Sequence, residues 1–359
     1  MPDASAKPPH ARPPADRLHL AVLTAGADRP GWHVVDLARA AAARDIDIQR
    51  VSWRRIHGGL SSPSLPAVAD ADTSLDHVDA MLLRTMPAGS LEQIIFRMDL
   101  LGAAAGRGVT IVNPPRAIEI AVDKYLCLNR LNAAGAPTPA TAVCQRAVDA
   151  RAAFEALGGD VILKPLFGSE GFGMTRINDP DLADRAFTML ERMQSVIYLQ
   201  QFIDHGGRDA RLFVIAGQVV AAMERRSPGW RTNVAKGGDA VVIQPDDEQQ
   251  ALAIKAAAAC GTLVAGVDLL EDRDGKRYVI EVNAVPGWRK LAEVTHIDIA
   301  GRVLDFIAEL TRGRQGRKRH TDETDELNSP TDATSHNTAD THDALSAADP
   351  RNVFPRETQ

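Results

Sequence analysis

Cysteine is scarce and shows no pattern in this 359-residue chain. Its three cysteines, Cys127, Cys144 and Cys260, lie far apart and include no CxxC pair. This spacing supports neither a disulfide framework nor a thiolate zinc site. We therefore expect three reduced thiols, each buried like a small apolar residue.

Long hydrophobic runs and an excess of one charge are also missing. No window approaches the roughly 18 uninterrupted apolar residues that span a bilayer, and the Pro- and Ala-rich N-terminus has no apolar signal core. With 41 Lys and Arg against 47 Asp and Glu, the formal net charge of −6 does not favour nucleic acid or an anionic membrane as a partner. We expect a cytoplasmic protein that binds neither.

The two ends of the chain are polar and poor in large apolar residues. We expect residues 1–17 and 313–359 to be disordered. Between them, short β-like runs alternate with helix-period segments, which is typical of a mixed α/β (α+β) fold. Asn113-Pro114-Pro115 interrupts this pattern, because proline cannot continue a ladder. The sequence therefore predicts an N-terminal α/β domain over 18–115 and a second domain over 116–312.

The N-terminal domain is expected to hold a small open parallel sheet. Its clearest helix begins at Ser90, where Ser90 and Gln93 make a capping box. The predicted apolar face of that helix consists of Leu91, Ile94, Ile95, Met98 and Leu101. The other predicted elements are strands over 19–24, 46–53, 79–84 and 109–112 and a helix over 34–44.

The second domain is predicted to mix strands with helices. It opens with a helical piece through Lys124 and Leu131 and closes with an amphipathic helix over 299–310. We expect His205 to be exposed in a loop. The predicted strands are 160–166, 196–203, 208–216, 218–226, 264–270 and 277–285.

A glycine-rich segment, DVILKPLFGSEGFGM, begins with one of these strands. The strand delivers Lys164 to its end, and Gly168, Gly171 and Gly173 make a loop with few Cβ atoms, so that backbone N–H groups could approach a phosphate closely. The segment matches neither GxxxxGK[ST] nor GxGxxG. Taken alone, it is equally typical of a plain hairpin.

Acidic residues accompany two later strands. Strand alternation places Glu281 and Asn283 on one face, with Ile280 and Val282 on the other. Asp268 lies in the apolar run GVDLL. Two carboxylates and an amide oxygen are ligands that Mg²⁺ prefers. The alternative is that the acids only pair with arginines or backbone groups.

A basic cluster lies in sequence between the glycine-rich segment and these acidic residues. Asp209 and Arg211 share a strand face, and a further set of cationic and amide residues follows closely. Guanidinium groups suit phosphates and carboxylates, and charge that develops in phosphoryl transfer needs such clamps. That further set is Arg225, Arg231, Asn233 and Lys236. Together with the glycine loop and the acids, the cluster indicates a nucleoside-triphosphate site.

Taken in order, these segments resemble the RimK-like glutamate ligases of the ATP-grasp superfamily. The motifs that carry the resemblance are Lys124, Lys164-Pro165 with GSEGFG, Gln201-Phe202-Ile203, Asp209-Ala210-Arg211, Ala222-Met223-Glu224-Arg225, Trp230-Arg231-Thr232-Asn233, Lys236-Gly237-Gly238, Gly266-Val267-Asp268 and EVNAVPG from Glu281 to Gly287. The resemblance implies an ATP-grasp fold, with a pre-ATP-grasp parallel sheet over 18–115 and two lobes over 116–312 that bind ATP between them.

The resemblance also implies roles for individual residues. Lys124 and Lys164 would contact ATP phosphates, beneath a loop of Gly168, Ser169, Glu170, Gly171 and Gly173. The other implied nucleotide contacts are Gln201, Phe202 and Ile203 at adenine, Asp209 at ribose, and Arg231, Thr232 and Asn233. The implied ligands of Mg²⁺, or of Mn²⁺, are Asp268, Glu281 and Asn283. The implied catalytic residues are Arg225 and Arg211, and the implied substrate contacts are Lys236, Gly237 and Gly238.

The activity implied is that of an ATP-dependent, ADP-forming carboxylate–amine ligase that works through an acyl-phosphate. Its partners would be small-molecule or peptide carboxylates and amines, and a homo-oligomer is left open. Two departures concern substrate choice: Lys236 replaces an Arg of many relatives, and Trp288-Arg289 is bulkier than the family pattern. Segments 84–92 and 113–119 resemble a sub-branch found with methanopterin-type one-carbon cofactor genes.

Two alternatives to a ligase are considered. The first is a nucleotide-binding scaffold or regulatory module with the same fold and no ligase activity. The second is a dinucleotide site in the N-terminal sheet, which is disfavoured because the turn after Thr24, AGADRPGW, lacks GxGxxG.

Overall fold

A computed structural model of the chain describes residues 17–26, 29–62, 64–71, 73–168, 173–232 and 239–327. The described residues as far as Gln315 form one compact unit. The expected disordered lead, apart from Arg17, and residues 328–359 of the expected tail lie outside the described residues. The last helix, α9 (Ile299–Leu327), is longer than the predicted 299–310 and takes in the first part of that tail. Extending a helix that is already nucleated is far cheaper than starting one, so polar residues can continue it.

A parallel sheet forms the N-terminal part of the fold, as predicted. Its strand order is β2-β1-β6-β7. The strands are β1 (Leu18–Thr24), β2 (Ile46–Ser52), β6 (Ala80–Leu83) and β7 (Thr110–Val112), and the helices are α1 (Trp32–Ala41) and α2 (Leu91–Gly106). A small antiparallel sheet that was not predicted consists of β3 (Ile56–His57), β4 (Ala69–Asp70) and β5 (Thr73–Ser74).

Helix α2 begins as predicted, because both hydrogen bonds of the Ser90–Gln93 capping box are present. Its predicted apolar face is wrong in part. Leu91 is 76% exposed and Ile95 is 49% exposed, whereas Met98 and Leu101 are buried. The buried residues of α2 begin at Arg97, so only the later turns pack against the sheet, and periodicity cannot show where a helix runs past the core.

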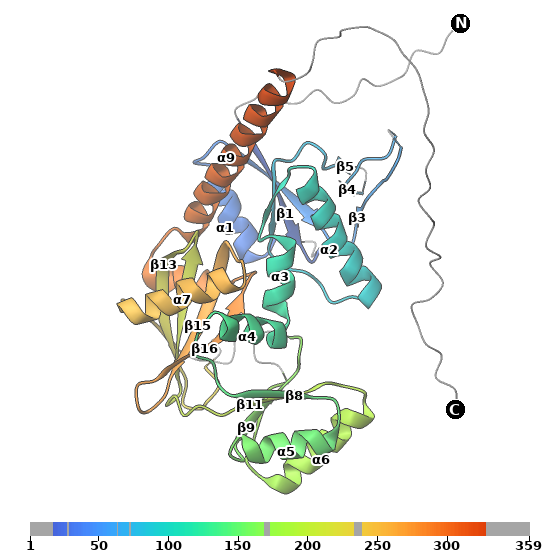
Figure 1. Ribbon diagram of the computed structural model, residues 1–359. Helices are drawn as coiled ribbons and strands as arrows, with labels where there is room; N and C mark the ends of the chain where they lie inside the picture. The colour runs from blue at the N-terminus through green and yellow to red at the C-terminus, as the bar shows by residue number, and fades with distance from the viewer. Residues whose placement is uncertain are drawn as a thin grey trace, which may run out of the picture. The chain divides into compact units, whose positions relative to one another are not determined.

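Two antiparallel sheets make up the rest of the unit (Figure 1). The smaller has the order β10-β9-β11-β8, and helices α5 and α6 pack against it through a shared core. Its elements are β8 (Thr141–Cys144), β9 (Val161–Lys164), β10 (Thr175–Ile177), β11 (Ile197–Gln201), α5 (Ala147–Ala156) and α6 (Pro180–Arg192).

The larger antiparallel sheet has the order β14-β13-β12-β15-β16, and α4 and α7 pack on it. Its strands are β12 (Arg208–Ile215), β13 (Gln218–Arg226), β14 (Asp239–Val242), β15 (Val264–Glu271) and β16 (Arg277–Asn283). The helices are α3 (Pro115–Val122), α4 (Lys124–Ala133), α7 (Asp247–Ala259) and α8 (Arg289–Thr295).

A β-bulge in β16 changes the predicted alternation. Asp268 pairs with Glu281 and Leu269 pairs with Val279, which leaves Ile280 as an extra residue. Ile280 was predicted to lie on the face opposite Glu281, yet both line the same cavity. The prediction fails because a bulge inserts one residue and breaks the two-residue period of the strand.

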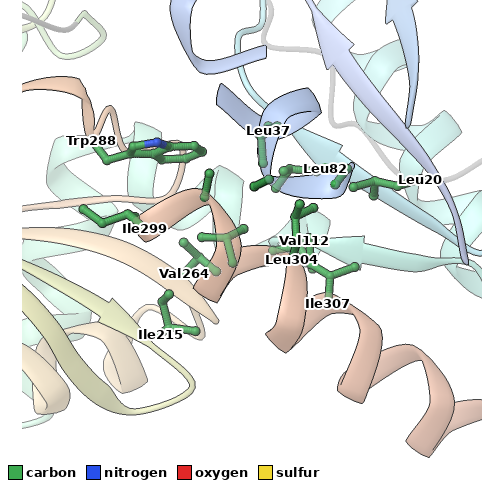
Figure 2. Packing of buried hydrophobic residues seen from close by; sticks show 14 of the residues in the cluster. Leu20, Leu37, Leu82, Val112, Ile215, Val264, Trp288, Ile299, Leu304 and Ile307 are labelled. Carbon is green, nitrogen blue, oxygen red and sulfur yellow. The ribbon is translucent and has the colours of Figure 1, made fainter. Parts of the chain in front are cut away.

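One hydrophobic core joins the parallel sheet to the larger antiparallel sheet. Figure 2 shows Leu20 and Leu82 from the parallel sheet packed with Ile215, Val264 and residues of α9. At about 1.5–3 kcal/mol for each fully buried aliphatic side chain, this shared core is a large stabilising term. Among the described residues, none of the helices is both long enough and apolar enough to cross a bilayer.

Candidate active site

A cavity is lined by both antiparallel sheets and by the start of α4. Strands β9 and β11 supply one wall, and β12, β13, β15 and β16 supply the other. The lining residues are Lys124, Pro139, Ile162, Lys164, Met174, Tyr198, Gln200, Gln201, Phe202, Ile203, His205, Asp209, Arg225, Trp230, Arg231, Thr232, Asp268, Leu270, Ile280 and Glu281. Apolar side chains and a few charged groups therefore share one hollow, as is usual for small-molecule sites.

Most of the described candidate residues meet in this cavity. Those on its walls are Lys124, Lys164, Gln201, Phe202, Ile203, Asp209, Arg225, Arg231, Thr232, Asp268 and Glu281. Gly168, Gly173, Arg211 and Asn283 are described but do not line it. Ser169, Glu170, Gly171, Asn233, Lys236, Gly237 and Gly238 lie outside the described residues.

Two carboxylates oppose each other on neighbouring strands of the cavity wall. Asp268 of β15 is the register partner of Glu281 of β16. Arg211 binds Asp268 in a bidentate pair, with Nε donating to Oδ1 at 2.7 Å and Nη2 donating to Oδ2 at 3.0 Å. Arg225 Nη2 also donates to Asp268 Oδ2, at 2.9 Å. Burial opposes the charge of Asp268, but Arg211 and Arg225 outweigh it and lower the pKa of this carboxyl.

Glu281 differs from Asp268 in its hydrogen bonds and ion pairs. None of the described residues donates a hydrogen bond to its carboxylate or forms an ion pair with it. Desolvation and the charge of Asp268 raise the pKa of Glu281, against the pull of Arg211, Lys124 and Lys164. A carboxylate without a protein partner, opposite a second carboxylate, fits the oxygen-rich site that a divalent cation requires.

Asn283 does not share the cavity wall. Its side-chain Oδ1 accepts a hydrogen bond from the backbone N–H of Val285 at 3.0 Å. An amide oxygen has a second lone pair, so this contact leaves Asn283 able to bind a cation. Among the described residues, no three His, Cys, Asp or Glu side chains are grouped as a metal site.

Arg225 joins two acids in the buried floor of the site. Its Nε and Nη2 donate to Asp209 at 2.5 and 2.7 Å, in addition to the bond with Asp268. The Thr232 hydroxyl donates to Asp209 as well. Burial alone would lower the pKa of Arg225, but the two carboxylates outweigh it and raise that pKa above its usual value. The guanidinium is therefore a permanent charge held in one orientation.

Two lysines bring positive charge to the opposite wall. Asp123 caps α4 by accepting from two backbone N–H groups, which places Lys124 in the first turn. Lys124 Nζ donates to the Gly168 carbonyl at 2.9 Å, and Lys164 Nζ donates to Gln200 Oε1 at 2.5 Å. Burial lowers the pKa of Lys164 to about 8, against the effect of Glu281, and burial also lowers the pKa of Lys124.

The segment after β11 forms the apolar side of the cavity. Phe202 is held in place because its backbone N–H donates to the Asp160 carbonyl at 3.0 Å. The guanidinium of Arg176 lies 3.5 Å from the centre of the Phe202 ring, and its own charge is paired with Asp160. Such a cation–π contact stabilises one orientation of the ring.

Several lining residues were missed or misplaced by the sequence analysis. His205 was expected to be exposed, but it is buried on the cavity wall, with Nδ1 2.7 Å from the Arg208 carbonyl. Gln200 is also buried, and Tyr198 lies beside the site. Strand alternation through 198 and 200 could have found the last two, whereas only the folding of the following turn buries His205.

Comparison with known proteins shows to which family the chain is similar. The chain matches the RimK-like ATP-grasp domain over residues 121–307. The tetrahydromethanopterin:alpha-L-glutamate ligase of Methanosarcina acetivorans is 30% identical in an alignment 266 positions long that covers 66% of this chain and 82% of that protein. A probable alpha-L-glutamate ligase of Pseudoalteromonas translucida is 32% identical over 284 residues, which is 78% of this chain and 92% of that protein.

A solved structure confirms the predicted fold. The ATP-grasp ligase PsnB, complexed with a phosphomimetic variant of its minimal precursor, Mg and ADP, has a TM-score of 0.63 at 22% sequence identity. The alignment covers 82% of this chain and 99% of that chain. The chain therefore belongs to the RimK-like ATP-grasp family and is a carbon–nitrogen ligase.

Proposed function

We propose that the enzyme binds ATP with a divalent cation in this cavity and joins a carboxylate to an amine through an acyl-phosphate. The single observation that carries the proposal is that fixed cations and a partner-free carboxylate line the same hollow. Lys124, Lys164 and Arg225 are the cations, and Glu281 is the carboxylate. The family membership and the ligase names of the relatives support the same class of reaction.

The nucleotide would lie with its phosphates toward the two lysines. Adenine would meet Gln201, Phe202 and Ile203 on the apolar side. A carboxylate has about four lone-pair positions, so the hydrogen bonds that Asp209 accepts from Arg225 and Thr232 leave one for a ribose hydroxyl. ATP would thus bind between the two lobes of residues 116–312, with residues 18–115 as the N-terminal domain that shares a hydrophobic core with the larger antiparallel sheet.

The reaction is a phosphoryl transfer followed by an acyl transfer. A carboxylate oxygen of the substrate attacks the γ-phosphorus of ATP, and the bond to the ADP oxygen breaks. The amine then attacks the acyl carbon, phosphate leaves with the electrons of the C–O bond, and the nitrogen loses a proton. Arg225 would stabilise the negative charge that develops at the acyl-phosphate, because its guanidinium is already oriented and desolvated.

Asp268 and Glu281 would hold Mg²⁺, with Asn283 beside them. When bound, the cation would supply positive charge against the transferred phosphoryl group. The Asp268 carboxylate is held by Arg211 and Arg225, so these arginines would orient the ligand as well as balance its charge. The Glu281 carboxylate would be free to bind the cation, since no described residue forms an ion pair or a hydrogen bond with it.

The amine is proposed to be an amino acid of the glutamate type, and the acceptor a peptide or a small molecule. Relatives named for alpha-L-glutamate support the first part. The tetrahydromethanopterin in one relative's name makes a pterin cofactor one acceptor to test. Lys236 and Trp288 depart from the family pattern, so we propose to test several acceptors.

The test is an assay of nucleotide products. The full chain is incubated with ATP, Mg²⁺, L-glutamate and a panel of carboxylic acids that includes peptides and pterin derivatives, and each component is omitted in turn. ADP and phosphate are expected only when acid and amine are both present. AMP with pyrophosphate would contradict the acyl-phosphate route, and ADP release that no acid or amine stimulates would indicate a nucleotide-binding module without ligase activity.

A further inference from the structure

Arg84 is a buried cation that forms no ion pair with any described residue. It follows β6 directly and is only 6% exposed. No described residue accepts a hydrogen bond from its side chain or forms an ion pair with it, and its Nε is enclosed without an acceptor. Burial lowers the pKa of Arg84 to about 9. Because a buried, unpaired charge costs free energy, an apolar residue would serve the ligand-free fold better.

The guanidinium rests on an aromatic platform. It lies 4.2 Å from the centre of the Trp288 ring. The Trp288 backbone N–H donates to His33 Nε2 at 3.0 Å, and its indole Nε1 donates to Asp36 at 3.0 Å. Figure 2 shows Trp288 in the shared core with Leu37 of α1 and Leu82 of β6. Trp288, the bulky departure noted from the sequence, therefore holds Arg84 in position.

Arg84 supplies a positive charge at this place, and the second nearby cation, Arg289, is paired with Glu293. Burial lowers the pKa of His33 to about 4, with the charge of Arg84 adding to the decrease, so His33 is neutral at pH 7. The Asp36 carboxylate is already engaged by Trp288 and by Arg39, whose Nη2 donates at 2.8 Å. One forked guanidinium beside a neutral imidazole suits a monoanionic carboxylate better than a doubly charged phosphate.

Arg84 lies at the end of β6, in a part of the parallel sheet where ligands commonly bind in such folds. In the order β2-β1-β6-β7, the chain goes from β1 to β2 on one side and then crosses to β6 on the other side of β1. The direction of the strand order therefore reverses between β1 and β6, which is the topological switch point. The Arg84 N–H donates to the Leu23 carbonyl at 2.9 Å, and the Ala25 N–H donates to Thr85 Oγ1 at 2.8 Å. Open parallel sheets bind ligands at the carboxyl ends of the strands at such a point.

The chain runs from the cavity wall at β16 to Trp288, beside Arg84, through one loop. Residues 284–288 follow β16 and end at Trp288. A Cβ on Gly266 would lie 3.2 Å from Pro286 of this loop and 3.7 Å from Arg211 Nε. Arg211 in turn holds Asp268. Pro286, in the loop that supports Arg84, and Arg211, which orients an acid of the cavity wall, therefore both lie close to Gly266.

We propose that Arg84 binds a carboxylate of the amino-acid substrate, one that is not consumed in the ligation. The proposal rests on the proposed function, since it assigns the amine substrate of that reaction to the chemical class of amino acids with a free α-carboxylate. It adds a binding residue in the N-terminal sheet, outside the cavity that holds the other candidate residues.

The test measures binding without turnover. Thermal unfolding of the full chain is followed with Mg²⁺ and a non-hydrolysable ATP analogue, and with L-glutamate, L-aspartate, L-alanine, L-lysine or the α-amide of each. At least one amino acid is expected to raise the Tm of the parent protein, while its α-amide raises it less. Arg84→Met is expected to lose this response and to keep the response to the ATP analogue.

Arg97→Met is the matched control. Arg97 is equally buried, at 6% exposed, but its Nη1 donates to the Pro87 carbonyl at 2.7 Å. Its substitution should lower the Tm of the ligand-free protein and leave the amino-acid response intact. Arg84→Met should not lower the ligand-free Tm as far. If Arg84→Met fails to fold, Arg84→Lys, which keeps the charge and loses the fork, should fold and bind at least about 10-fold more weakly.

Three results would overturn the proposal: no amino acid in the panel raises the Tm of the parent, the amide binds as well as the acid, or an Arg84 variant responds like the parent. A failure of the proposed function is seen separately. In that case the amino-acid response persists and depends on Arg84, but amino acids stimulate no ADP formation with any acid.

Discussion

Asp268 and Glu281 lie directly opposite each other on antiparallel strands, yet only Asp268 is paired with arginines. Two adjacent carboxylates repel unless a cation lies between or beside them. Among the described residues, arginines balance the charge of Asp268, and none pairs with Glu281. The ligand-free site therefore has a paired and an unpaired carboxylate side by side.

We predict that Glu281→Gln lowers the rate of ADP formation at least about 100-fold, because the amide cannot replace a charged ligand of the cation. The fold should survive, since Glu281 makes no ion pair with a described residue. Steady-state assays across Mg²⁺ concentrations measure the effect. Glu309→Gln on the exposed face of α9 is the control and should leave the rate unchanged; a Glu281→Gln enzyme with parental turnover would refute the metal assignment.

We predict that Arg225→Met destabilises the protein by about 3–5 kcal/mol, because it leaves Asp209 and Asp268 buried without one of their counter-ions. Urea unfolding monitored by circular dichroism gives the free energy of unfolding. The neighbouring Arg226 is half exposed and pairs with Glu224 at the surface. Arg226→Met should change the stability by less than about 1 kcal/mol, and equal losses in the two variants would show that the buried network is not stabilising.

We predict that the affinity for ATP falls as the pH rises above about 8. The pKa of Lys164 is lowered from 10.5 to about 8, so its positive charge is lost in the ligand-free site above that pH. The unfolded chain still binds this proton up to pH 10.5, so Lys164 makes the free energy of unfolding rise with pH between about 8 and 10.5. Titration with a non-hydrolysable ATP analogue at several pH values measures the affinity.

Lys164→Arg tests the cause of that pH dependence. Its guanidinium stays charged throughout the range. The decline in affinity above pH 8 should therefore be reduced in the variant. A decline of the same size in Lys164→Arg would assign the effect to another group.

We predict that Asn113→Ala costs at least about 2 kcal/mol of stability, because buried backbone groups lose their partners. Asn113 Nδ2 donates to the carbonyls of Val264 and Ala284, at 2.7 and 2.6 Å, and its Oδ1 accepts from Leu263 and Val264. These bonds tie the end of β7 to the larger antiparallel sheet.

Asn132→Ala serves as the comparison for Asn113→Ala. Within the described residues, the Asn132 side chain makes one exposed hydrogen bond, which it accepts from the Thr138 hydroxyl. Its loss should cost less than about 1 kcal/mol, as measured by the same urea unfolding. If Asn113→Ala is no more costly than Asn132→Ala, the link between the two sheets contributes little to stability.

Local order was predictable where neighbours in sequence determine it. The Ser90 capping box, the location of each strand of the N-terminal sheet and the turn between β12 and β13 all depend on residues a few positions apart. The motif series from Lys124 to Glu281 also indicated one nucleotide site, and most of its described members do line one cavity.

What the sequence by itself determined was the family and the residue types of the site, because motif spacing and strand period are properties of the chain. Only the tertiary structure decided which groups meet: the bulge that places Ile280 and Glu281 on the same cavity, the pairing of Arg211 with Asp268, and the burial of Arg84 against Trp288. The last two are contacts between segments far apart in sequence, and the bulge depends on how β16 pairs with β15. Their energies depend on desolvation and geometry, which no local pattern contains.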